Sequence, residues 1–155
     1  MNQKLKNQHI HLALHNEQAC DFLNSSNLYF DWVITSAFYA ALHYVSAVIF
    51  PVSFDLEGET ETAPDVGTYR EFIGSRENKH RLMTDLVYRN CRGIGYSYRA
   101  LLDLSYAARY ETGCHARFYS DKARRYMAAI KAYCVDASDP FNVQVKIPED
   151  RLQAN

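Results

Sequence analysis

The fold is decided by residues 28–49, which read LYFDWVITSAFYAALHYVSAVI. The large apolar side chains of this stretch cover more than one face of a helix, which predicts a helix at the centre of the molecule. They are Trp32, Val33, Phe38, Leu42, Val45 and Ile49. Thr35, Tyr39 and His43 recur every four residues and form one polar stripe on this helix. A polar stripe on a buried helix must find hydrogen-bond partners or line a cleft.

Four further segments have helical spacing of apolar residues, and turn-forming residues separate them. We expect helices over residues 8–24, 77–90, 97–110 or 111, and from 120 or 121 to 135. Pro51 ends the central helix and Gly113 follows the fourth one. The predicted fold class is therefore all-α, an up-and-down bundle of four to five helices.

The chain has the length of one domain, so we expect a single helical domain over residues 1–155 with its core in about 8–135. Five acids and no base lie between residues 51 and 68, and this acidic stretch is predicted to be a mobile loop. About residues 138–155 are predicted to form an extended tail. Residues 143–147 alternate like a strand, but one isolated strand does not make a sheet domain.

Charge gives little general attraction to nucleic acid, because the formal net charge is −1. The distribution is uneven, however: residues 70–131 contain 13 Lys and Arg against six acids. Such asymmetry permits a basic face on a neutral protein, although ordinary solvated helix faces explain it as well.

The four cysteines are scattered without a C-x-x-C pair, which favours reduced thiols over a zinc finger. The N-terminus is polar, and no run of about 18 uncharged apolar residues appears. We therefore expect a cytoplasmic protein that has no membrane partner. A Gly-rich phosphate loop is missing from the sequence, so no cofactor is predicted.

Three elements together resemble the HEPN family (higher eukaryotes and prokaryotes nucleotide-binding). They are the aromatic-Ala-Ala-Leu-His run that ends at His43, the segment NKHR at 78–81 before a helix, and LLDLSYAARY at 101–110 before an Ala-rich last helix. The resemblance covers about residues 8–135 and implies a helical bundle. It also implies a homodimer.

The resemblance further implies an RNA-directed protein, since many HEPN members are metal-independent ribonucleases of toxin–antitoxin or defence systems. Those enzymes use an Arg followed four to six residues later by a His, and here Arg109 and His115 have five residues between them. Arg109 would stabilise charge on the phosphate, and His115 would act as acid or base. Two departures are Tyr110, where members often have Asn, Asp or His, and Gly113, which suggests that His115 lies in a turn.

RNA is the expected ligand, and an antitoxin or another protein is an expected partner. Substrate binding is expected from residues that this topology brings near Arg109 and His115. They are His80, Arg81, Tyr110, His43 and Tyr39. The plainer alternative gives each a structural role: Arg109 would pair with Asp103 or Asp31, and Tyr39 and His43 would be hydrogen-bonded between helices.

The alternative function is a non-catalytic HEPN module for dimerisation, nucleotide binding or partner-protein binding. In the enzyme, Arg109 and His115 of two subunits should converge in an open basic groove. In the module, Arg109 should pair with a carboxylate and His115 should point away. A metal-binding four-helix protein is the third alternative, but the paired Glu-x-x-His motifs of such bundles are missing from the sequence.

Overall fold

The structure, a computed structural model, describes residues 2–113 and 116–135. The expected extended tail and the strand-like residues 143–147 lie outside this range, as does His115. The described elements, in chain order, are α1 (Asn2–Ser26), α2 (Phe30–Ile49), β1 (Val52–Leu56), β2 (Glu59–Ala63), α3 (Val66–Phe72), α4 (Lys79–Asn90), the 3-10 turn η1 (Arg92–Ile94), α5 (Gly95–Tyr110) and α6 (Arg117–Cys134).

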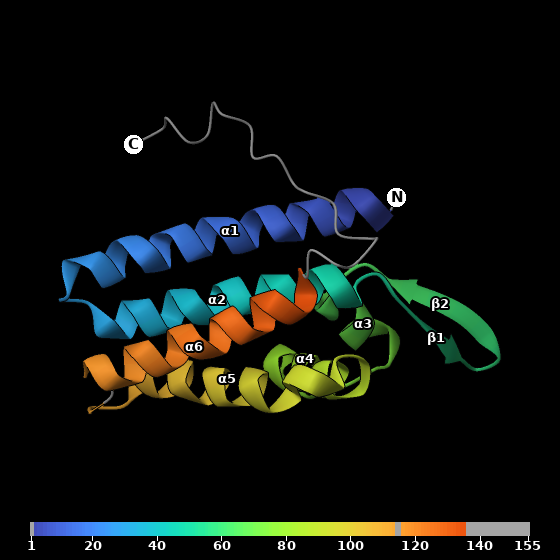
Figure 1. Cartoon of the computed structure of the whole chain (residues 1–155). Helices are drawn as coiled ribbons and strands as arrows, with labels where there is room; N and C mark the ends of the chain where they lie inside the picture. Colours follow the sequence, from blue (N-terminus) through green and yellow to red (C-terminus); the bar gives the residue numbers. More distant parts are fainter. Residues whose placement is uncertain (1, 114–115, 136–155) are drawn as a thin grey trace.

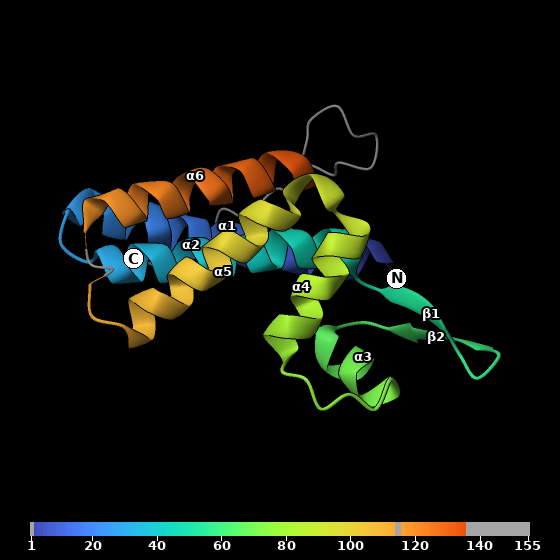
Figure 2. The same cartoon turned by 90° about the horizontal axis from the view of Figure 1, so that it is seen from below.

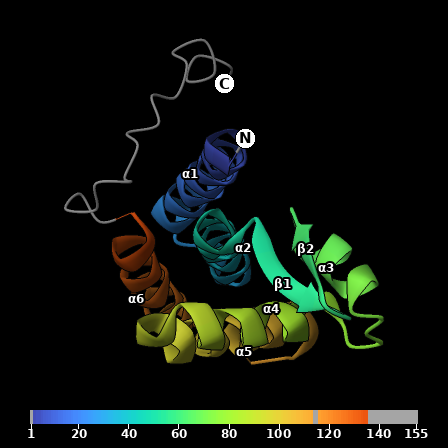
Figure 3. The same cartoon turned by 90° about the vertical axis from the view of Figure 1, so that its right-hand side faces the viewer.

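The described part of the chain is a helical bundle in which four long helices run up and down (Figure 1). α1 and α2 form one antiparallel pair and α5 and α6 form another, while α4 crosses at an angle below them (Figure 2). Seen from the end, α2 lies in the middle, with α1, α6 and α5 around it (Figure 3). The prediction of a mostly helical bundle with residues 28–49 at its centre is confirmed.

The side chains of α2 explain its central position. Twelve of its residues are buried, and they face α1, α5 and α6 in turn. Phe38, Ile34, Val33 and Val45 are fully buried. Trp32 is the exception: the sequence placed it in the core, but its side chain is 58 % exposed because it stands in the first turn, where the neighbouring helices end.

α2 is the one described helix that is long and apolar enough to cross a membrane. Of its most apolar window, 67 % is buried inside the bundle. Burial of this kind is the pattern of a core helix, in which the other helices take the place that lipid would fill.

The acidic stretch is not a loop, so that prediction was wrong. β1 and β2 pair as an antiparallel hairpin, with Val52 opposite Ala63 and Leu56 opposite Glu59. The turn uses Glu57 and Gly58, both at positive φ, and Asp55 accepts a hydrogen bond from the Gly58 backbone nitrogen (2.9 Å). Asp55, Glu57 and Glu59 are exposed on the hairpin, while Phe54 packs on α3.

The predicted helices all exist, but three details differ. α1 begins at Asn2 rather than near Gln8. α3 was not predicted, so the bundle has six described α-helices rather than four or five. α6 begins at Arg117 rather than at Ser120 or Asp121. Ser120 is buried, and its hydroxyl donates to the Arg117 carbonyl within the first turn (2.9 Å), so it does not act as the N-cap.

Candidate functional site

Arg109 is held at the side of α5 by neutral partners. Its Nε donates to the carbonyl oxygen of Ser105 at 3.1 Å, and its Nη1 donates to the hydroxyl of Tyr39 on α2 at 3.4 Å. The guanidinium carbon also lies 5.5 Å from the ring centre of Tyr110 and 6.0 Å from that of Tyr106. Among the described residues, no carboxylate lies within 4 Å of the Arg109 guanidinium.

The two tyrosines beside Arg109 face the solvent. Tyr106 is 57 % exposed and Tyr110 is 69 % exposed, and their ring centres are 4.9 Å apart. Tyr106 and Tyr110 are one helical turn apart on the same face of α5, and the Arg109 guanidinium carbon lies within 6.0 Å of both ring centres. Arg109 therefore lies within a small aromatic surface that a ligand can reach.

His80, in the first turn of α4, is the described imidazole that interacts with Arg109. Its ring packs against Phe38 of α2, with ring centres 5.6 Å apart. Burial lowers the pKa of His80 below its ordinary value, and the positive charge of Arg109 lowers this pKa further. His80 is therefore mainly neutral at pH 7 and can accept a proton.

A groove of about 610 Å³ lies between α4 and α5, next to this cluster. Its walls carry both signs of charge; they are formed by Asn78, His80, Arg81, Thr84, Asp85, Arg99, Leu102, Asp103 and Tyr106. Arg81 pairs with Glu77 at 3.5 Å, and Arg99 pairs with Asp103 at 3.1 Å. The groove is thus close to neutral in charge. Arg109, which has no described carboxylate partner, lies beside it.

The α4 end of the groove follows from its sequence. Asn78 is the N-cap of α4, and its Oδ1 accepts a hydrogen bond from the Arg81 backbone nitrogen (2.9 Å). This cap fixes the helix start, so His80 in the first turn faces α2, while Arg81 is exposed at the groove.

The polar stripe of α2 finds three different partners. Thr35 donates to the Asp31 carbonyl of its own helix (2.9 Å), and Tyr39 accepts from Arg109. His43 turns to α1, where its Nδ1 lies 3.3 Å from Nδ1 of His9. Of the five residues expected to bind substrate, Tyr39, His80 and Tyr110 thus gather at Arg109 and Arg81 lies in the groove, whereas His43 belongs to a separate pair.

The expected ion pair of Arg109 with Asp103 or Asp31 is not found among the described residues, because Asp103 pairs with Arg99 instead. His115 lies outside the described residues, so the predicted pairing of His115 with Arg109 stays a prediction.

Tyr106, Arg99 and His9 belong to these sites but are not among the site residues that the sequence predicts. Tyr106 has a detectable signal, because it precedes Arg109 by three residues and so lies on the same helix face. Arg99 and Asp103 are likewise one helical turn apart. His9 has no such signal, because only the packing of α1 on α2 brings it to His43.

No family model matches this chain, and no match to it was found among the curated proteins or among the solved structures. The described residues also contain no group of three or more His, Cys, Asp or Glu side chains arranged to hold a metal ion.

Proposed function

We propose that this chain is an RNA-directed protein of the HEPN type, and that it is a metal-independent ribonuclease of a toxin–antitoxin or defence system. The observation that carries the proposal is the environment of Arg109. An exposed aromatic pair and two neutral hydrogen-bond acceptors surround its guanidinium, and no described carboxylate neutralises it.

A guanidinium in this state is suited to a phosphate. Arginine has five N–H donors, and Arg109 uses two of its nitrogens for Ser105 and Tyr39. The remaining donors can bind a phosphate oxygen and stabilise the charge that grows on it during transfer. Bases next to that phosphate can stack on Tyr106 and Tyr110, since both rings are exposed.

Cleavage through the 2′-hydroxyl also requires a group that takes up a proton near pH 7. The resemblance assigns this role to His115. His80 is a second candidate, because burial lowers its pKa and it lies near enough to Arg109 for the guanidinium charge to lower this pKa further. Its imidazole is therefore mainly neutral at pH 7. The two assignments predict loss of cleavage from substitution of different histidines, so one set of variants distinguishes them.

The test is cleavage of a mixed RNA pool by the purified chain in the presence of a chelator. Arg109→Ala is expected to reduce the rate by about 10²-fold or more, the usual effect of removing one group that stabilises transition-state charge. Arg125→Ala is the matched control, because Arg125 is exposed on α6 away from the groove. His115→Ala and His80→Ala show which imidazole transfers the proton.

The second candidate function is the non-catalytic HEPN module that binds a nucleotide or a partner protein. The neutral charge of the groove favours it, since Arg81 and Arg99 are already paired with acids. RNA binding that Arg109→Ala abolishes, without cleavage by the unmodified chain, would select an RNA-binding module. If the chain neither cleaves nor binds RNA, the RNA-directed proposal is wrong. The homodimer and the cytoplasmic location belong to this proposal too.

A further inference from the structure

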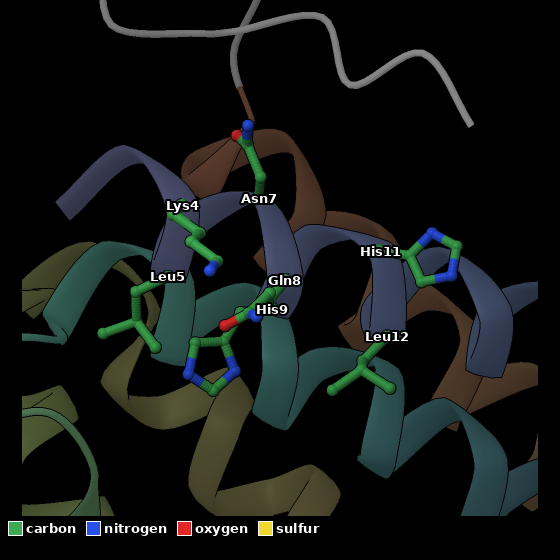
Figure 4. Close-up of a pocket in the computed structure, with 7 residues that line it drawn as sticks. All are labelled: Lys4, Leu5, Asn7, Gln8, His9, His11 and Leu12. Atoms are coloured by element: carbon green, nitrogen blue, oxygen red, sulfur yellow. The ribbon is translucent and has the colours of Figure 1, made fainter. Parts of the chain in front are cut away.

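A pair of histidines joins α1 and α2. Nδ1 of His9 and Nδ1 of His43 are 3.3 Å apart, and the ring centres are 5.5 Å apart with a tilt of 32°. Figure 4 shows His9 projecting from α1 toward α2, whereas His11, half a turn further, points outward. Both rings of the pair are half-buried.

Two Nδ1 atoms at this distance share one hydrogen atom, because the Nδ1–H of one ring donates to the lone pair of the other. The nitrogens of two imidazoles that bind one tetrahedral metal ion, each at about 2.0–2.1 Å, are about 3.4 Å apart. The observed separation of 3.3 Å therefore fits a shared metal ion without a movement of either helix.

We propose that His9 and His43 form a binding site for a divalent transition-metal ion of the zinc class, with both Nδ1 atoms as ligands. Imidazole nitrogen is a preferred ligand of such ions. The ion takes the place of the shared proton, which moves to solvent or to the Nε2 atom of the same ring. No third His, Cys, Asp or Glu completes the site among the described residues, so water supplies the other ligands.

The surroundings favour this cation. The negative charge of Asp65 acts on His9, and it would attract a metal ion bound there in the same way.

Solvent can reach the pair through a broad hollow of about 850 Å³ along α1, lined by Lys4, Leu5, Asn7, Gln8, His9, His11 and Leu12 (Figure 4). Lys4 is the positive group of this lining and opposes the ion, so the site should be weaker than a buried three-ligand site. The pair is also one helical turn from Tyr39, which binds Arg109. Metal binding would thus fasten α1 to α2 beside the candidate functional site.

The experiment is isothermal titration of the full chain with zinc chloride at pH 7.5 in a buffer that does not bind metal. We expect one zinc ion bound by this pair, with at least tenfold weaker binding to His9→Gln and to His43→Gln. His15→Gln, an exposed histidine of the same helix, is the matched control and should keep the affinity of the unmodified chain. Circular dichroism confirms that each variant is folded.

Imidazole NMR signals of the unmodified chain give a readout that needs no variant. Zinc should shift the ring resonances of both His9 and His43 together. The absence of zinc binding would overturn the proposed site. A zinc affinity that stays unchanged in either Gln variant would overturn it too. Since RNA cleavage is assayed in chelator, its failure and the failure of the metal site are separate results.

Discussion

Tyr98 places a polar group in an unfavourable environment in the core. Its side chain is fully buried, with the Phe38 ring centre 6.0 Å away, and its hydroxyl has no hydrogen-bond partner among the described residues. A buried hydroxyl without a partner costs about 1–3 kcal/mol of desolvation. Tyr98→Phe removes that cost with little change in shape, so the free energy of unfolding should rise by about 1 kcal/mol.

Urea unfolding of Tyr98→Phe beside Tyr44→Phe tests this expectation. Tyr44 is equally buried, but its hydroxyl donates to the carboxylate of Glu17, which Lys131 also binds at 2.9 Å. Tyr44→Phe removes a bond to a charged acceptor and should lower stability by about 1.5–3 kcal/mol. Loss of stability in Tyr98→Phe would mean that its hydroxyl has a partner, such as a buried water.

Three histidines make stability depend on pH. The pKa values of His9, His43 and His80 are lowered, in each case mainly by burial. Between the folded and unfolded pKa values the unfolded chain binds more protons than the folded chain, so stability rises with pH there. Their contribution is complete above the unfolded pKa of about 6.5 and is lost as pH falls through it toward the lower folded values.

The measurement is urea unfolding at pH 7.5 and at pH 5.5, where most carboxylates stay ionised. The unmodified chain should be less stable at pH 5.5, and His43→Gln should lose less stability between the two values. In His43→Gln the pair can no longer be doubly charged at pH 5.5. His15→Gln should behave like the unmodified chain, and an equal drop in His43→Gln would refute the role of the pair.

At the level of elements, helices were predictable and the hairpin was not. A helix repeats its buried face every three or four residues, so α2, α4 and α5 were recognised, with ends that differ by about two residues from the prediction. The strands have only five residues each, and their acids hide a short alternation of Val52, Phe54 and Leu56. The acidic composition therefore outweighs the periodicity, and the sequence predicts a loop.

Phe54 anchors this hairpin to α3. Its ring centre lies 5.1 Å from that of Tyr69 in an edge-on contact and 5.9 Å from that of Phe72. A two-stranded hairpin alone is marginally stable in water, so Phe54→Ala should release it while the bundle stays folded. Hydrogen exchange should become faster in residues 52–63 and remain slow in α2.

Thr60→Ala is the control for Phe54→Ala, because Thr60 is exposed near the tip of the same hairpin. It should leave the exchange rates nearly unchanged. Equal protection in both variants would show that backbone pairing holds the hairpin without Phe54.

At the level of the whole molecule, the candidate site depends on contacts that no local pattern contains. Arg109 was selected from its spacing to His115, but its partner Tyr39 is 70 residues away in the chain. His80 and Arg109 lie near each other because α4 and α5 pack on each other and on α2. The sequence could therefore propose the residues of this site, whereas the separation of His43 into a pair with His9 required the packing of α1.

The same arrangement leaves an apolar end on the bundle, where α1 ends and α2 and α6 begin (Figure 1). The exposed side chains there are Phe22 (77 %), Leu28 (71 %), Trp32 (58 %) and Phe118 (63 %). Arg117 holds the start of α6 at this end, since its Nη1 donates to Asn27 in the α1–α2 turn at 3.5 Å. Exposed apolar patches of this kind mark interaction surfaces, so we expect the proposed homodimer to form here.

Trp32 is the single tryptophan of the chain, and it reports this association directly. Its fluorescence should shift to shorter wavelength as protein concentration rises, because dimer formation would remove the indole from water. Phe22→Glu places a charge in the surface and should abolish the shift and give a monomer in sedimentation, whereas Gln18→Glu, an exposed change one turn earlier on α1, should not. A dimer that forms without a change in Trp32 emission would place its interface elsewhere on the bundle.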